Sequence, residues 1–88
     1  MEVSESLLKK ITFNQQNLVN ALAKKPEGML SREITHKTGI SNKSDIINKK
    51  FLALLAKEDL EIHIERISRQ WLWILRSTKD VKDYIKKK

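Results

Sequence analysis

The sequence predicts a small α+β domain that is mostly helical, and three observations lead to this class. The chain has 88 residues, enough for one hydrophobic core and too few for two. Apolar residues recur at helical spacing up to about residue 58, and from Leu60 onward the spacing becomes the alternation of a β-strand. Hydrophobic residues make up 40% and charged residues 33% of the chain, which is typical of globular proteins and not of disordered ones.

Several classes of protein are excluded by the same composition. The chain has no cysteine, so disulfides and thiolate metal sites are ruled out. No apolar run approaches the roughly 18 residues that would span a bilayer. Residues 1–10 lack the pattern of a secretory signal. We therefore expect a cytoplasmic protein, nucleoid-associated if the source is bacterial or archaeal, with no membrane partner.

Two helices are expected in the first third of the chain. Residues 4–11 carry three apolar side chains at helical spacing behind serines that can cap, and this short segment could fray or serve as a dimer arm. A stronger helix follows, because Thr12 and Gln15 have the spacing of a capping box. Pro26 and Gly28 end it.

The next elements are a very short strand and a short helix. Met29 and the residue after it can add one ladder pair to a sheet. Ser31 is expected to cap a helix over residues 32–38, and Gly39 to end that helix in a left-handed conformation.

A longer helix should follow, capped by Ser41 or Ser44 and running to about Glu58. On a helical wheel its core-facing stripe is formed by Ile47, Phe51, Leu54 and Leu55, whereas Asn42, Asp45, Lys49 and Ala56 fall on the opposite side.

A hairpin closes the predicted domain. Residues 60–65 alternate between apolar and polar side chains, which indicates a strand with one solvent-facing side. Residues 68–70 are a polar turn, and residues 71–75 form an unbroken apolar strand. Since both faces of that strand are apolar, we expect a tail helix capped by Thr78 to cover the second face. Its apolar residues would be Val81, Tyr84 and Ile85.

This order of elements resembles the winged helix-turn-helix superfamily. The segment SREITHKTGIS looks like the first helix and turn of that motif, and LLAKEDLEI resembles the junction between recognition helix and wing. The likeness covers residues 13–76 of a single domain, 1–88, with an N-terminal arm (1–12) and a C-terminal helix and basic tail (77–88). Two or three more residues than usual lie between Ser41 and the leucine pair, so the recognition helix is either extended or preceded by a longer turn. The helical wheel favours the longer turn, with Ser44 as the cap, because Lys43 would fall on the core side of a helix that included it. Asp59 stands where many relatives have glycine, and aspartate tolerates the left-handed conformation better than most residues.

The resemblance implies a DNA-binding protein, either sequence-reading or architectural, with transcription regulation as the expected role. The recognition helix, about residues 44–58, would lie in the major groove, and the wing, residues 65–71, would reach the backbone or the minor groove. The residues suited to reading bases are Asn42, Asp45, Asn48 and Lys49. Those suited to holding phosphates are Ser31, Arg32, Lys37, Lys43 and Lys50, with Arg66 and Arg69 at the wing tip. To form one continuous cationic surface for DNA, the long helix and the wing tip must face the same side of the molecule.

The charge distribution also favours a polyanionic partner. The net charge is +7. Residues 31–57 hold six basic against two acidic side chains, and residues 78–88 hold five against two. A localised positive field attracts nucleic acid through counterion release. Together with the resemblance, which implies DNA, this makes double-stranded DNA the expected partner.

An enzyme is not expected, and neither is a cofactor or a small-molecule site. The two glycines are both at helix ends, so there is no phosphate-binding loop. His36 and His63 lie on different elements, which argues against a metal site. Trp71 and Trp73 could stack on bases, but a shared strand face with Leu75 favours core or partner contact.

Two alternatives remain open from the sequence. A winged helix can serve as a protein-binding or assembly module, because a fold does not fix a function. Ile46 and Leu52 lie off the core stripe and, with the apolar residues of segment 4–11, could form a homodimer interface. RNA binding is the other alternative, since basic patches do not distinguish duplex types.

Overall fold

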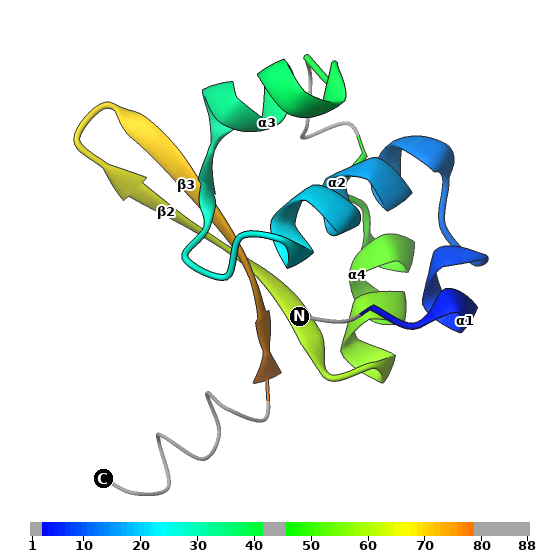
Figure 1. Ribbon diagram of the computed structural model, residues 1–88. Helices are drawn as coiled ribbons and strands as arrows, with labels where there is room; N and C mark the ends of the chain where they lie inside the picture. Colours follow the sequence, from blue (N-terminus) through cyan, green and yellow to red (C-terminus); the bar gives the residue numbers. More distant parts are fainter. Residues whose placement is uncertain (1–2, 42–45, 79–88) are drawn as a thin grey trace, which may run out of the picture.

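The hairpin is the longest feature of the structure and extends beyond the helices that pack at its base (Figure 1). The computed structural model describes residues 3–41 and 46–78. Within them four helices accompany a three-stranded antiparallel sheet of order β1-β3-β2, which confirms the α+β class. In chain order the elements are α1 (Glu5–Leu8), α2 (Phe13–Ala23), β1 (Met29–Leu30), α3 (Ser31–Thr38), α4 (Lys49–Lys57), β2 (Leu60–Ile67) and β3 (Gln70–Ser77).

The sheet follows the predicted pairing. Strands β2 and β3 pair from Leu60 opposite Ser77 to Ile67 opposite Gln70. On the other edge of β3, the two residues of β1 pair with Trp73 and Leu72, so the predicted short ladder is confirmed. The turn is shorter than expected: it holds residues 68 and 69, and Gln70 already belongs to β3.

Helix α2 begins with the predicted capping box. The hydroxyl of Thr12 accepts from the backbone N–H of Gln15 at 3.2 Å, and the Gln15 side-chain oxygen accepts from the backbone N–H of Thr12 at 2.9 Å. Gln15 is also buried, and its Nε2 donates to the carbonyl of Ile46 at 2.8 Å. One side chain therefore caps α2 and ties it to the segment before α4.

The cap predicted for α3 was wrong by one residue. Ser31 is the first residue of the helix, and Leu30, still in extended conformation, is its N-cap. Because the chain passes directly from β1 into α3, the capping role falls to Glu33, whose carboxylate accepts from the backbone N–H of Leu30 at 3.3 Å. The predicted C-terminus is confirmed, since Gly39 is left-handed with φ of 76°.

Helix α4 starts later than predicted. Neither Ser41 nor Ser44 is its cap: the helix begins at Lys49, and Asn48 caps it by accepting from the backbone N–H of Phe51 at 2.9 Å. The carbonyl of Ile46, which an earlier start would use within the helix, is taken by Gln15. Residues 46–48, which the sequence placed inside the helix, therefore lie before it.

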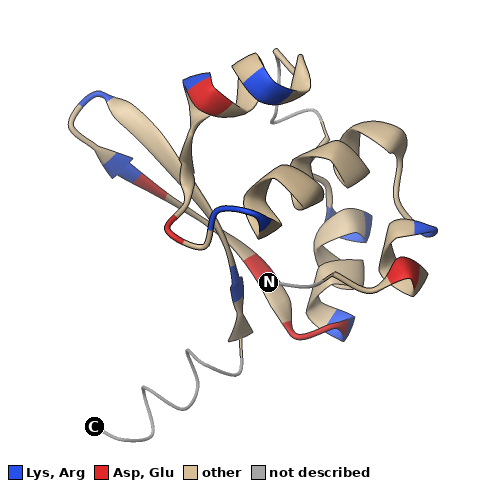
Figure 2. Ribbon diagram, in the orientation of Figure 1, with Lys and Arg blue, Asp and Glu red and all other residues tan. Residues whose placement is uncertain are grey.

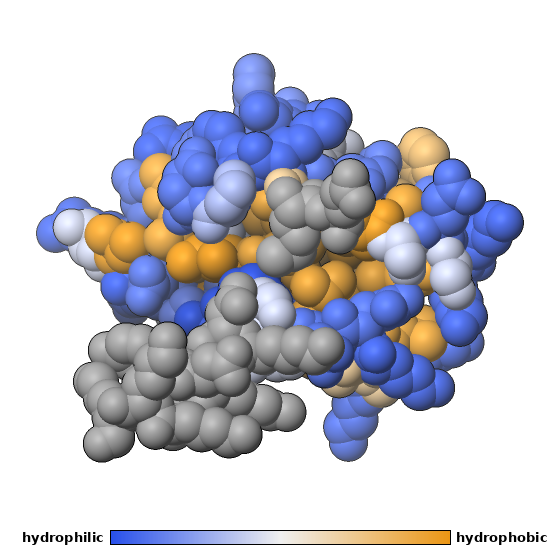
Figure 3. All heavy atoms as spheres, turned by 60° about the horizontal axis from the view of Figure 1, so that its bottom comes forward, coloured by the Kyte–Doolittle hydropathy of each residue, from blue (hydrophilic) through white to orange (hydrophobic). Residues whose placement is uncertain are grey.

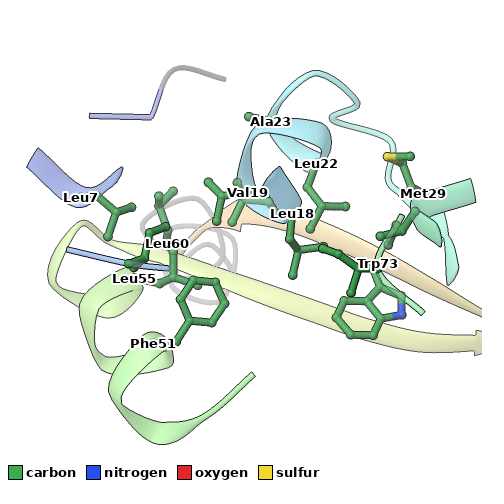
Figure 4. Packing of buried hydrophobic residues seen from close by; sticks show 14 residues of the cluster. Leu7, Leu18, Val19, Leu22, Ala23, Met29, Phe51, Leu55, Leu60 and Trp73 are labelled. Atoms are coloured by element: carbon green, nitrogen blue, oxygen red, sulfur yellow. The ribbon is translucent and has the colours of Figure 1, made fainter. Parts of the chain in front are cut away.

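The core lies between α1, α2 and α4 and the inner face of the sheet (Figure 4). Phe51 and Leu55 of the predicted stripe are buried, and Ile47 and Leu54 pack against the cluster. Leu7 joins the core with Ile11, so the N-terminal apolar residues are covered by the chain itself. The buried apolar residues are Leu7, Ile11, Leu18, Val19, Leu22, Ala23, Met29, Ile34, Ile40, Phe51, Leu55, Leu60, Trp73 and Leu75.

Two further expectations concern the ends of the hairpin. Asp59, at the corner before β2, has a left-handed backbone with φ of 57°, as predicted for this position. The tail helix expected to carry Val81, Tyr84 and Ile85 lies outside the described residues.

Candidate nucleic-acid interface

A groove runs between the first turn of α3 and the tip of the β2–β3 hairpin. Its volume is about 380 Å³, within the range of about 300–1,000 Å³ that is usual for small-molecule sites. The groove has no acidic side chain among its lining residues, which are Leu30, Ser31, Arg32, Thr35, Arg69, Gln70 and Trp71. We call it the α3–hairpin groove.

Three predicted phosphate-binding residues meet in this groove. Ser31 and Arg32 come from α3, and Arg69 comes from the hairpin turn. They are brought together because β1, which leads directly into α3, pairs with β3 close to the hairpin tip. Figure 2 shows the basic positions of the hairpin tip beside those of α3.

The arginines of this region lack acidic partners. The chain has four arginines. Arg76, at the far end of β3, is paired with Glu61, with 2.5 Å between its Nε and Oε1. Across residues 3–41 and 46–78, no carboxylate lies in ion-pair distance of Arg32, Arg66 or Arg69. Within the described ranges their positive charges are therefore not paired with a carboxylate.

The hairpin tip also carries an exposed aromatic ring. Trp71 borders the groove and keeps 48% of its surface exposed. Arg66, its direct neighbour on β2, places its guanidinium carbon 5.7 Å from the ring centroid, a cation–π contact. Trp73, two residues further along the strand, is buried as predicted, so the two tryptophans have different environments.

The other predicted residues lie elsewhere. Lys37 borders a depression between α2 and α3 with Lys24 and two asparagines. Asn48 and Lys50 border a small pocket with Lys10 and Thr12. Lys49 is exposed on the first turn of α4. The remaining three candidates, Asn42, Lys43 and Asp45, lie outside the described residues.

The cationic groups that the structure brings together come from α3 and the hairpin, and not from the long helix and the hairpin as expected. Figure 1 shows the hairpin tip beside the start of α3, whereas α4 lies toward α1. The basic residue that faces the hairpin turn across the groove is Arg32 of α3. Helix α4 contributes no residue to the groove, so the structure does not bring the long helix and the hairpin turn together there.

The exposed side of α4 offers little for reading bases. Its exposed residues are lysines, alanines and one leucine, namely Lys49, Lys50, Leu52, Ala53, Ala56 and Lys57. Base recognition relies on side chains that pair donors and acceptors with base edges. Asn48 has such a side chain, but its oxygen is used to cap the helix.

Next to the groove, Glu33 is held in its ionised form. The backbone N–H of Leu30 donates to its carboxylate, and the ammonium of Lys25 lies 3.2 Å from Oε2. These contacts lower the pKa of Glu33 below its ordinary value of 4.5. Glu33 is therefore occupied by the helix start and by Lys25.

Sequence reasoning missed Trp71, Gln70 and Thr35 as groove residues. Strand alternation placed Trp71 on the same face as Trp73, but the helical layer does not extend as far as the hairpin tip. The usable signal was the position of Trp71 only two residues after the turn. The tip of a hairpin often extends beyond the helices that pack on the sheet, so side chains there stay exposed.

The described residues contain no group of three His, Cys, Asp or Glu side chains that could hold a metal ion. His36 is exposed, and His63 lies 3.5 Å from Glu65. No helix in the described ranges has the length and apolar character needed to cross a bilayer. Comparisons of the chain with protein-family models, curated proteins and solved structures gave no significant match.

Proposed function

We propose that this protein binds double-stranded DNA, as a binding protein and not an enzyme, and that the α3–hairpin groove is its anchor. One observation carries the proposal: three of the four arginines gather at the first turn of α3 and the hairpin tip, and no carboxylate pairs with them in the described residues. Arginine binds phosphate through paired N–H donors. Two such groups on facing elements can hold a sugar-phosphate backbone.

The arrangement of elements supports a winged-helix form of this binding. The order of helices and strands and the sheet order β1-β3-β2 are compatible with that fold. In winged helices the hairpin contacts the DNA backbone or minor groove. Here Arg66 and Arg69 occupy that hairpin, and Ser31 and Arg32 extend the contact surface onto α3.

The proposed mode is architectural, with contacts mainly to the backbone. Phosphate contacts position a protein on DNA, whereas base-edge contacts give specificity. The described groove is rich in groups for the first task, while the exposed side of α4 is poor in groups for the second. Base reading by Asn42 and Asp45 stays a prediction.

The test is a salt titration of binding to a labelled duplex, read by fluorescence anisotropy. Each phosphate contact contributes about −0.9 to the slope of log affinity against log salt concentration. We expect Arg69→Gln and Arg32→Gln each to weaken binding and to make the slope shallower by about one. Arg76→Gln is the matched control, because it removes the same charge from an arginine already paired with Glu61.

Three results would contradict the proposal. These are an affinity that does not change with salt, equal losses for Arg69→Gln and Arg76→Gln, or tighter binding to an RNA duplex of the same sequence. A further comparison locates the anchor: Arg69→Glu should reduce affinity more than Lys49→Glu, because Lys49 lies on α4 and not in the groove.

A protein-binding role is the second candidate, favoured by exposed apolar side chains. Leu52 is 41% exposed on α4 beside two exposed alanines, and Figure 3 shows apolar side chains in a band across one face of the molecule. The case for a dimer through segment 4–11 is weaker than it was from the sequence, because Leu7 and Ile11 are buried in the chain's own core. Light scattering of the wild type and of Leu52→Glu tests this role: a dimer that the substitution dissociates would support it.

A further inference from the structure

We infer that the α3–hairpin groove holds one unpaired nucleotide of DNA, with its base stacked on Trp71 and its flanking phosphates bound by Arg32 and Arg69. The protein would then prefer duplexes that carry an overhang or another unpaired base. This inference rests on the proposed function and names the kind of DNA that its groove selects.

The first argument is the exposure of Trp71. A tryptophan is among the largest apolar side chains, and burying it in a core or an interface is strongly favourable. Trp71 nevertheless stays 48% exposed at the edge of a groove, although the same strand buries Trp73 to 6% exposure. An exposed ring at the rim of a cationic groove is the combination used to bind unpaired bases.

The second argument is that the ring already has a contact that favours its position at the groove. Arg66 lies over Trp71 on the neighbouring strand, and the two residues are direct partners in the β2–β3 register. The contact favours the observed rotamer of the indole over the others, which reduces the conformational entropy lost when a base stacks on it. The residue is still 48% exposed despite this contact.

The third argument is the chemistry of the remaining lining. Arg32 and Arg69 border the groove without a carboxylate partner in the described residues, which suits phosphates. Gln70 follows Arg69 in the chain and precedes Trp71, and its amide can both donate to and accept from a base edge. Phosphate donors, a stacking surface and an amide thus share a groove of about 380 Å³.

A base that is paired inside a duplex cannot stack on Trp71 while its phosphates bind Arg32 and Arg69. Inside a duplex both faces of a base are covered by its neighbours, and flipping it out requires breaking stacking and pairing. An unpaired nucleotide at an overhang has already lost most of those contacts. The groove therefore selects unpaired positions, while the arginines bind the adjoining backbone.

The experiment compares three DNAs at one fixed salt concentration: a blunt duplex, the same duplex with a short single-stranded overhang, and that duplex with an abasic overhang. The abasic version keeps the added phosphates and removes the bases. We expect the normal overhang to bind more tightly than the abasic one. Trp71→Ala should reduce this preference by about 5- to 150-fold, or abolish it where it is smaller, since stacking on an aromatic side chain is worth about 1–3 kcal/mol per base.

Two further variants separate stacking from a general effect on the fold. Trp71→Phe keeps an aromatic face and should retain most of the preference. Phe13→Ala removes an aromatic side chain that is 75% exposed on another element, at the start of α2, and should change nothing. Tryptophan fluorescence gives an independent readout: the normal overhang should quench the wild type, but not Trp71→Phe, in which only the buried Trp73 remains.

The outcomes distinguish the inference from the proposed function. Equal affinity for the normal and abasic overhangs, or an unchanged preference in Trp71→Ala, would overturn the inference while salt-dependent duplex binding still stood. Quenching of equal size in wild type and Trp71→Phe would also count against it. Failure to bind any of the three DNAs would overturn the proposed function itself.

Discussion

The side-chain oxygen of Asn48 accepts a hydrogen bond from the backbone N–H of Phe51, at 2.9 Å. This bond fixes the first turn of α4 and sets Phe51 on the buried side of the helix, where only 1% of its surface is exposed. A residue that the sequence suggested for base reading thus has a structural task. The two roles make different predictions.

We expect Asn48→Ala to lower the free energy of unfolding by about 0.5–2 kcal/mol, because the N–H of Phe51 loses its side-chain partner. Asn48→Asp and Asn48→Ser should retain most of the stability, since both side chains can cap. Urea denaturation followed by circular dichroism measures the difference. An alanine variant of wild-type stability but weakened DNA binding would instead favour the base-reading role.

Phe51→Ala should cost about 3–5 kcal/mol, because it removes a fully buried aromatic side chain and leaves a cavity. Domains are stable by only about 5–15 kcal/mol, so the variant should lose a large part of its stability and melt far below wild type. Leu52→Ala is the control from the next position, where the side chain is 41% exposed, and it should melt close to wild type. Similar melting temperatures for the two variants would show that the buried side of α4 is wrongly assigned.

The two glycines should respond differently to alanine. Both have positive φ, 99° at Gly28 and 76° at Gly39. At Gly39 an added Cβ meets no atom within 4 Å, so the cost is that of the left-handed backbone, about 1–2 kcal/mol. At Gly28 the Cβ would lie 2.7 Å from Cγ1 of Ile74 and 3.0 Å from the carbonyl oxygen of Trp73.

We therefore expect Gly28→Ala to lower the melting temperature more than Gly39→Ala. Thermal unfolding of both variants beside the wild type checks this order. The reverse order would mean that the loop before β1 can move away from β3 at little cost.

Glu33 should make stability depend on pH at the acid end. Its contacts with the Leu30 N–H and with Lys25 lower its pKa in the folded state. The stabilisation is therefore present above the ordinary pKa of 4.5 and is lost as the pH falls through the lower folded value. Wild type should melt above Glu33→Gln near neutral pH, and the difference should disappear in acid. A difference that is constant with pH would show that the charge of Glu33 is not involved.

Much of the local structure was predictable from short-range signals. The capping box of Thr12 and Gln15, the left-handed Gly39 and Asp59, and the antiparallel hairpin all depend on residues close together in the chain. The core-facing side of α4 followed from the spacing of Phe51 and Leu55. Their geometry depends on backbone conformation and periodicity, which the residue types largely fix.

The errors came from contacts between distant residues. At the start of α4 the local cap, Asn48, was missed, and a distant residue also takes part, since the amide of Gln15 takes the carbonyl of Ile46 from 31 positions away. The cap of α3 depends on where β1 ends, which its pairing with β3 decides. The sequence shows which hydrogen-bonding groups and strand residues are present, but it does not show which distant residue each of them contacts.

The candidate site divides in the same way. The residue types suited to phosphate binding, and their positions on α3 and at the hairpin turn, were determined by the sequence alone. Only the tertiary structure decided that Arg32 and Arg69 share one groove with Trp71 and that Arg76 is neutralised by Glu61. The pairing of β1 with β3 joins residues far apart in the chain, and it places the start of α3 beside the hairpin only when the two strands are packed together.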